Sequence, residues 1–227
     1  MSLAVVTGAG RGIGRAVAMR LASRGLDVAL LARSRHELDE TAAAVTFRGG
    51  RAQVVPCDLA SASEVTRAAA EVTAAMGAPC VLVNNAGIVR RALVHEMTET
   101  DFDAVLDVNL RAVFLVTRAL LPIMLDKRHG RVVMVASIAA TLGTPQLSAY
   151  CAAKWGVVGF TKALAEELRN TGVQAMCVMP GSVDTEMLKG SGFAPQMSPE
   201  DVANLVVYAA LDAPDAMNGS AIEIFGP

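Results

Sequence analysis

Seven short apolar or β-branched runs alternate along the chain with longer segments of helical composition. The runs cover residues 3–7, 28–31, 52–55, 80–83, 132–136, 173–178 and 221–225. The intervening stretches, such as 13–23, 61–76 and 148–170, are rich in Ala, Leu and Glu and long enough for helices. Continuous apolar strands separated by helices predict a parallel sheet covered on both faces, because crossover connections place helices there. The pattern predicts an α/β fold with a doubly wound, seven-stranded parallel sheet.

The composition fits one globular unit and excludes several classes of protein. Of the 227 residues 53% are hydrophobic and only 19% are charged, which excludes a disordered chain. No linker, charge block or repeat divides the sequence, so we predict a single domain over residues 1–227. Twenty basic against 22 acidic residues give a net charge of −2. That balance provides no basic field for nucleic acid or an anionic membrane.

The cysteines and histidines show no metal-site or disulfide spacing. The four cysteines are far apart and have no C-x-x-C pair, which favours reduced thiols in a cytoplasmic protein. No pair among the three histidines has metal-ligand spacing, so no metal is predicted. The amino terminus lacks a cationic region and a long apolar core, so no export signal is expected. The uncharged stretch 132–153 is interrupted by turn residues and predicts a strand, a loop and a helix start.

A glycine-rich turn follows the first predicted strand. Residues 7–14 read T-G-A-G-R-G-I-G and lead directly into a predicted helix. Glycines let the backbone approach a pyrophosphate, whose charge is met by the free N–H groups at the helix start. The position between strand and helix separates this motif from an ordinary turn and predicts a dinucleotide site.

Further motifs follow in a fixed order. They are Asp58 after the third strand, N-N-A-G at 84–87, a set of four polar residues, and P-G-x-x-x-T at 180–185. The four polar residues are Asn109, Ser137, Tyr150 and Lys154. Together with the glycine turn, these motifs resemble the short-chain dehydrogenases/reductases over residues 3 to about 187. The resemblance implies a Rossmann-type oxidoreductase with the four polar residues as its catalytic set.

The spacing of these four residues is chemically reasonable. Tyr150 and Lys154 are four residues apart in a predicted helix and share one face. A nearby ammonium group and an oxidised nicotinamide both favour the phenolate, which would make Tyr150 a usable proton donor and acceptor. Ser137, expected where the fifth strand ends, would donate a hydrogen bond to the substrate oxygen. The resemblance further implies that Lys154 holds the nicotinamide ribose and that Asn109 anchors a water in a proton relay.

The resemblance also implies the residues that contact the nucleotide, and the second strand indicates which nucleotide it is. The implied contacts are Gly8, Gly10, Arg11, Gly12, Ile13, Gly14, Arg33, Asp58, Leu59, Asn85, Ala86, Gly87, Tyr150, Lys154, Pro180, Gly181, Val183 and Thr185. A carboxylate at the end of the second strand would bind a ribose 2′-hydroxyl, but Ala32 stands there. Arg33 and Arg11 suit a 2′-phosphate instead, so we expect NADP(H) as cofactor.

The substrate is expected to be a small-molecule ketone or a 3-oxoacyl thioester. The central third of the chain most resembles bacterial 3-oxoacyl-acyl-carrier-protein reductases. This resemblance makes an acyl-carrier protein a candidate partner. Its candidate docking cluster consists of Arg128, Arg131 and Arg169. Residues 187–198 are rich in Gly, Ser and Pro, whereas relatives usually carry a longer pair of lid helices there. Oxidation of a secondary alcohol or sugar, and a non-catalytic dinucleotide sensor, are the alternatives.

A homo-oligomer, either a dimer or a tetramer, is expected. The family resemblance implies such an assembly, and the predicted helices around 102–125 and 148–168 are more apolar than one sheet face requires.

Overall fold

Each of the seven apolar runs is a strand, and the strands form one sheet. The computed structural model describes residues 2–226. The strand order is β3-β2-β1-β4-β5-β6-β7, and every neighbouring pair is parallel. The strands are β1 (Leu3–Thr7), β2 (Asp27–Ala32), β3 (Ala52–Pro56), β4 (Pro79–Asn84), β5 (Gly130–Val135), β6 (Val173–Pro180) and β7 (Ala221–Ile224). The predicted doubly wound fold is confirmed.

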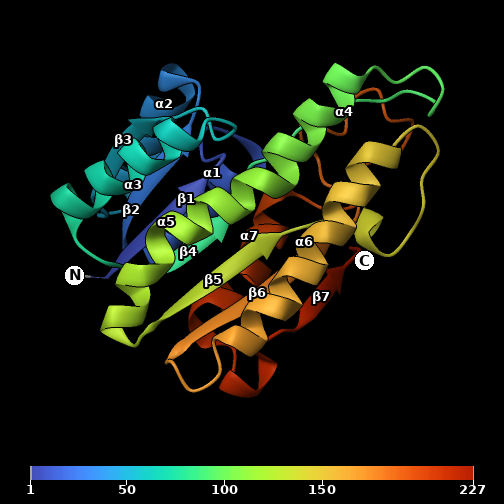
Figure 1. Cartoon of the computed structure of the whole chain (residues 1–227). Helices are drawn as coiled ribbons and strands as arrows, with labels where there is room; N and C mark the ends of the chain where they lie inside the picture. The colour runs from blue at the N-terminus through green and yellow to red at the C-terminus, as the bar shows by residue number, and fades with distance from the viewer. Residues whose placement is uncertain (1, 227) are drawn as a thin grey trace.

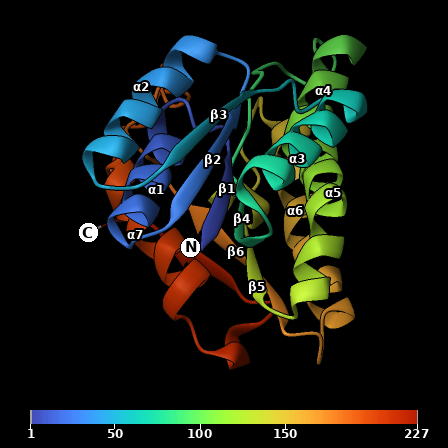
Figure 2. The same cartoon turned by 90° about the vertical axis from the view of Figure 1, so that its left-hand side faces the viewer.

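Helices cover both faces of the sheet (Figure 1; Figure 2). One face carries α1 (Gly12–Ser23), α2 (Arg35–Phe47) and α7 (Pro199–Val207). The other carries α3 (Ala62–Met76), α5 (Ala112–Lys127) and α6 (Ser148–Glu167). Between the larger elements lie α4 (Glu99–Leu106), the π-helical turns η1 (Asp107–Arg111) and η3 (Tyr208–Asp212), and the 3₁₀ turns η2 (Ile138–Ala140) and η4 (Asp215–Met217).

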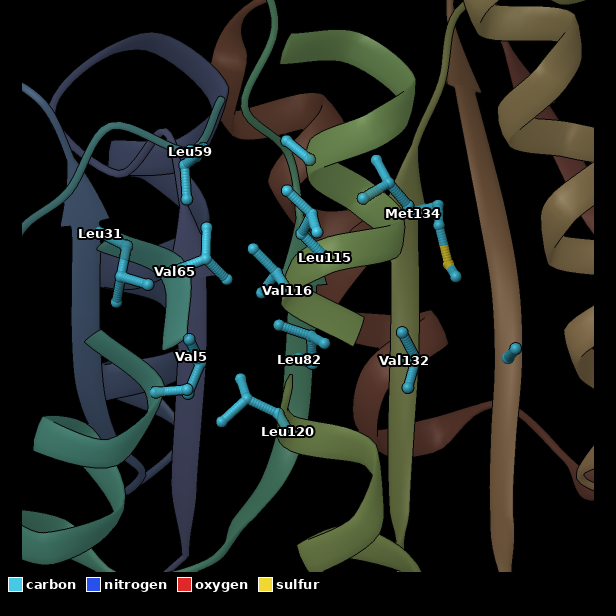
Figure 3. Close-up of a cluster of buried hydrophobic side chains, with 14 of the residues drawn as sticks. Val5, Leu31, Leu59, Val65, Leu82, Leu115, Val116, Leu120, Val132 and Met134 are labelled. Carbon is cyan, nitrogen blue, oxygen red and sulfur yellow. The ribbon is translucent and has the colours of Figure 1, made fainter. Parts of the chain in front are cut away.

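Two hydrophobic clusters, one on each face of the sheet, form most of the core. Alternate residues of β1 point to opposite faces: Val5 packs toward α3 and α5, whereas Val6 packs toward α1 and α7. Figure 3 shows Val5, Leu82 and Val132 meeting side chains of α5 such as Leu120. Because both faces are covered, every residue of β1 is buried. This double burial is the physical reason that the strands are continuous apolar runs.

The helical stretch Glu99–Lys127 passes the length and composition criteria for a membrane span. In its most apolar window 44% of the residues are buried inside the protein, and Leu115, Val116 and Leu120 contribute to the core. A helix that covers a sheet needs the same apolar residues, so the stretch is weak evidence for a membrane span.

The direction of the connections reverses between β1 and β4. From β1 the chain moves outward through β2 to β3, then returns to pair β4 with the other side of β1. In open α/β sheets the crevice at the carboxyl ends of the strands on either side of this reversal is where ligands bind. The glycine turn after β1 and the N-N-A-G stretch at the end of β4 both lie there.

Candidate active site at the carboxyl edge of the sheet

The glycine turn after β1 needs glycine for two separate reasons. Gly8 and Gly12 have φ values of +63° and +52°, a region that other residues rarely adopt. Gly14 packs so closely on the turn that a Cβ would collide with the Gly8 carbonyl oxygen and approach Asn85 Nδ2 to 2.5 Å. The turn therefore brings the first residues of α1 directly against the end of β1.

The amino terminus of α1 is left without a side-chain cap. Ser34, Ser61, Thr98 and Ser198 cap α2, α3, α4 and α7 by accepting a backbone N–H bond. The N-cap residue of α1 is Arg11, whose side chain accepts no such bond, and no acidic residue lies in the first turn. Free N–H groups and the positive end of the helix dipole favour an anion at this position. The α1 end therefore fits the diphosphate of a dinucleotide.

Hydrogen bonds tie the loop after β4 to the glycine turn. Asn85 Nδ2 donates to the carbonyl oxygens of Thr7 and Gly8, at 3.0 and 3.3 Å. The backbone N–H groups of Asn85 and Ala86 both donate to Thr7 Oγ1, at 2.9 and 3.1 Å. Thr7 was not among the predicted contacts, although it opens the fingerprint. The two motifs therefore form one connected wall.

Tyr150, Lys154 and Ser137 come together beside this wall. Tyr150 and Lys154 both lie in α6, as the spacing predicted, and Lys154 Nζ is 5.6 Å from the Tyr150 ring centroid. Lys154 is buried, and its Nζ donates to the Val135 carbonyl oxygen at 2.9 Å. Ser137 lies two residues beyond the end of β5, where its Oγ also caps the η2 turn by accepting from Ala139 N at 3.1 Å.

Asn109 is fully buried in the π-helical turn η1 and fixes the loop after β4. Its Nδ2 donates to the carbonyl oxygens of Ile88 and Val105, both at 2.9 Å, and its Oδ1 accepts from Ile88 N at 3.3 Å. A Cβ on Gly87 would lie 2.7 Å from Asn109 Oδ1 and 3.7 Å from Lys154 Nζ. Gly87 thus lies between Asn109 and Lys154 in space. The side chain of Asn109 positions the loop that carries Gly87.

Burial controls the protonation of both residues of α6. It lowers the pKa of Lys154 from 10.5 to about 8, so the group stays mainly charged at pH 7. Burial raises the pKa of Tyr150, while a hydrogen bond with Ser137 and the charge of Arg91 lower it. The expected bias toward a phenolate is therefore absent in the protein alone, where burial dominates. The Tyr150 phenol is held in the protonated form that a proton donor requires.

The remaining predicted nucleotide contacts line the same edge. Asp58 is exposed after β3 and accepts a hydrogen bond from Ala60 N. The Leu59 side chain is buried in the core and is therefore not available to a nucleotide. Thr185 Cγ2 would lie 3.2 Å from a Cβ on Gly12, so the segment after β6 closes over the start of α1. The structure gathers at this edge Gly8, Gly10, Gly12, Ile13, Gly14, Ala86, Pro180, Gly181, Val183 and Thr185.

Two charged residues near the site were not predicted. Glu37, in the first turn of α2, places its Oε1 3.6 Å from Arg11 Nη1, and its Oε2 would lie 3.1 Å from a Cβ on Gly10. Arg91 donates through Nη2 to the Met187 carbonyl oxygen at 3.1 Å. Glu37 gave no signal because its approach depends on how α2 packs. Arg91 could have been predicted from the sequence, because Arg90 and Arg91 follow closely after the N-N-A-G motif.

The candidate docking cluster lies at the opposite edge of the sheet. Arg131 is near the start of β5, and a strand of this length separates the two edges by roughly 17–20 Å. Its guanidinium pairs with Asp215 at 3.3 Å and donates to the Ala209 carbonyl oxygen. Arg169 pairs with Glu166 at 2.7 Å. Arg131 and Arg169 are thus paired with residues of the same chain, and the cluster does not border the candidate active site.

Comparison with known proteins identifies the family. The family model described as short chain dehydrogenase matches residues 2–194. A 3-oxoacyl-[acyl-carrier-protein] reductase of Synechocystis sp. is 38% identical over 220 residues, which cover 92% of this chain and 89% of that protein. The corresponding reductase FabG of Escherichia coli is 31% identical over 237 residues, covering 99% and 96% of the two chains.

Solved structures agree with this result. The crystal structure of levodione reductase superposes with a TM-score of 0.94 at 28% identity, and the match covers 98% of this chain and 95% of that one. The chain belongs to the short-chain dehydrogenase/reductase family, as the sequence motifs indicated. It is an oxidoreductase that acts on CH–OH and C=O groups with a nicotinamide nucleotide.

The buried ammonium group of Lys154 predicts a pH-dependent stability. Below pH 8 the group is charged in both the folded and unfolded chain, and its burial opposes folding. Between about pH 8 and 10.5 the folded chain loses the proton first, so the free energy of unfolding should rise by about 3 kcal/mol from this group. Lys154→Met should remove that rise.

Urea unfolding between pH 7 and 11 measures the effect. Burial raises the pKa values of Cys57 and Cys177 to about 11, and these thiols act in the opposite direction. The difference between wild type and variant cancels Cys57 and reports Lys154 together with its charge coupling to Cys177. Lys162→Met, an exposed position of α6, is the matched control. Identical pH slopes in the wild type and in Lys154→Met would contradict the assignment.

Proposed function

We propose that this enzyme is an NADPH-dependent carbonyl reductase that converts a ketone or 3-oxoacyl thioester into a secondary alcohol. The observation that carries the proposal is the convergence of Tyr150, Ser137 and Lys154 at the sheet edge that also holds the uncapped start of α1. The position of Thr185 over that helix start supports the same arrangement.

Each residue of the set has a separate task in this proposal. Bound NADPH supplies a hydride to the carbonyl carbon. Tyr150 donates a proton to the carbonyl oxygen, and Ser137 donates a hydrogen bond that stabilises the charge developing on it. Lys154 holds the nicotinamide ribose and provides a fixed positive charge near Tyr150. Asn109 acts through the loop it anchors and belongs to the proton relay that ends at Lys154.

Two alternatives use the same fold. In the first alternative, the same residues would catalyse the reverse reaction, the oxidation of an alcohol or sugar. Arg11 and Arg33 favour reduction instead, because they suit NADPH and cellular NADPH usually serves reductions. A non-catalytic dinucleotide sensor would not need a buried lysine next to a tyrosine whose pKa responds to a neighbouring serine. The acid–base set therefore favours an enzyme.

Replacing the proton donor should abolish turnover without preventing cofactor binding. A positioned acid–base group contributes about 10² to 10⁴ in rate, so Tyr150→Phe should lose at least a hundredfold in kcat. Turnover of a carbonyl substrate and fluorescence titration with NADPH are measured on the same preparation. Retention of more than about a tenth of wild-type turnover would limit the contribution to under about 1.4 kcal/mol and refute the assignment.

The preference for NADPH is supported by the charges at the corner between β2 and α1. Arg33 follows the last residue of β2, is exposed, and makes no ion pair with any residue from 2 to 226. Arg11 faces the same corner and is held 3.6 Å from Glu37. A 2′-phosphate would bind both guanidinium groups and compete with the Glu37 carboxylate for Arg11. Glu37 therefore weakens NADPH binding in this proposal.

Two variants separate these charges. Arg33→Ala should weaken NADPH binding by about ten- to a hundredfold, because charge-assisted hydrogen bonds contribute roughly 1.5–3 kcal/mol, and should leave NADH nearly unchanged. Glu37→Gln should strengthen NADPH binding several-fold by removing the competing charge. Dissociation constants are measured by fluorescence at one ionic strength. A wild-type preference for NADH, or equal effects of Arg33→Ala on both cofactors, would contradict the clamp.

We further propose that the enzyme acts in the cytoplasm as a dimer or tetramer. All four cysteines are free, which fits a reducing compartment. Three large aromatic side chains on α4, α5 and α6 are exposed: Phe102, Phe114 and Trp155, the last by 55%. Aromatic groups exposed on neighbouring helices favour burial against a second copy. An acyl-carrier protein, if the substrate is delivered on one, would have to dock at the carboxyl edge of the sheet.

Light scattering at micromolar protein tests the assembly. The wild type should have the mass of a dimer or tetramer, and Trp155→Glu should lower it because a charge would be buried in the interface. Phe47→Glu, at an aromatic residue that is 90% exposed on the opposite face, is the matched control and should keep the mass. A monomer mass for the wild type would contradict the proposal.

A further inference from the structure

Arg91 is a fixed cation on the substrate side of the site. The loop that carries it is anchored on two sides: Arg91 Nη2 donates to the Met187 carbonyl oxygen, and Ala92 N donates to the Gln146 carbonyl oxygen, both at 3.1 Å. Met187 belongs to the segment after Thr185, and Gln146 lies four residues before Tyr150. These bonds hold Arg91 between the Met187 segment and the loop that leads into α6, the helix of Tyr150.

The guanidinium group of Arg91 is available to a ligand. It is exposed, and within residues 2–226 it makes no ion pair. Its neighbour Arg90 is different, because it pairs with Asp101 at 3.2 Å. One of the five N–H donors of Arg91 is used by Met187, which leaves the others for an anion. Its charge also acts on the Tyr150 phenol and lowers the pKa of that group. Because Ala92 is bonded to Gln146, which lies four residues before Tyr150, the loop that carries Arg91 is held near the start of α6.

Exposed apolar side chains occur in the three segments that these two hydrogen bonds join. They are Leu93, Val94, Leu142, Met187 and Phe193. The charged residues in the Met187 segment are largely occupied with one another, since Glu186 pairs with Lys189 at 2.6 Å. An apolar rim with one unpaired cation suits a molecule that has a hydrocarbon body and a single anionic group.

We propose that Arg91 forms an anion-binding subsite beside Tyr150, and that the substrates of this enzyme are carbonyl compounds that carry a carboxylate or phosphate group. The inference rests on the proposed carbonyl reduction and narrows its substrate class. A carboxylate would accept a bidentate pair of hydrogen bonds from Arg91 and so orient the carbonyl group toward Tyr150 and Ser137. A free oxo acid and a phosphopantetheine thioester are the two sources of such an anion.

Matched substrates test the subsite. The wild type should reduce 4-oxo and 3-oxo carboxylates with a kcat/KM about ten- to a hundredfold higher than their methyl esters, because a hydrogen-bonded charge contributes roughly 1.5–3 kcal/mol. Arg91→Gln keeps a donor for the Met187 carbonyl oxygen but loses the charge. This variant should lose the preference for the carboxylate. Its kcat/KM for the methyl ester should stay within about threefold of the wild-type value. Arg91→Lys should retain part of the preference, and Arg90→Gln, the control, should retain all of it.

Two further measurements distinguish a subsite from a structural tie. The NADPH complex of Tyr150→Phe, whose turnover should be at least a hundredfold slower, is titrated calorimetrically with oxo carboxylate and ester, with and without Arg91→Gln. The affinity for the oxo carboxylate should depend on Arg91, whereas the affinity for the ester should not. In kinetics, Arg91→Gln should move the alkaline limb of the reduction profile to higher pH, because losing a positive charge raises the pKa of the proton donor.

The outcomes separate the two proposals. Equal losses on the oxo acid, its ester and a 3-oxoacyl phosphopantetheine thioester in Arg91→Gln would overturn the subsite and leave carbonyl reduction standing. A wild type that reduces no carbonyl compound but binds carboxylates through Arg91 would overturn the reaction and leave the subsite. Dependence on Arg91 confined to a phosphopantetheine thioester would assign the anion to the carrier rather than to a free oxo acid.

Discussion

The hydrogen bonds between Thr7 and Asn85 hold together the two halves of the site. They join the turn after β1 to the loop after β4, at the reversal of strand order. Gly14 packs against the same point, where the Gly8 carbonyl oxygen and Asn85 Nδ2 leave no room for a side chain. The start of α1 on one side and the Asn109–Lys154 group on the other are both positioned from this junction. A shift of either loop would separate the nucleotide end of the site from its acid–base end.

The two sides of the site are built with different rigidity. On the acid–base side, buried polar groups have backbone or side-chain partners: Lys154 donates to Val135, Asn109 to Ile88 and Val105, and Asn84 to Thr117. On the side that carries Arg91 the chain runs through exposed turns, which are tied together by individual hydrogen bonds such as Arg91 to Met187 and Ala92 to Gln146. In the proposed mechanism the sheet fixes the reaction geometry, whereas substrate selection depends on exposed segments that tolerate change.

The sequence was most informative where one residue type serves one physical requirement. Strands buried on both faces appear as continuous apolar runs, and Tyr150 and Lys154 must share a helix face at a spacing of four. It was least informative where tertiary packing decides. No local signal shows that α2 brings Glu37 to Arg11, or that the turn at Asp107–Arg111 widens to a π-helix around Asn109. The burial that governs the pKa of Tyr150 likewise depends on the assembled fold.

The uncapped start of α1 has a consequence beyond recognition. In α2, α3, α4 and α7 a serine or threonine of the same chain accepts a hydrogen bond from a first-turn N–H group. In α1 no side chain does so, and the first-turn N–H groups are available to a bound anion. A ligand that binds only the folded chain adds to its stability in proportion to the logarithm of its concentration over the dissociation constant. A nucleotide bound at this end would therefore supply part of the stabilisation of this helix, which packs on both α2 and α7. The nucleotide concentration of the cell thereby becomes one of the variables that set how much of this enzyme is folded.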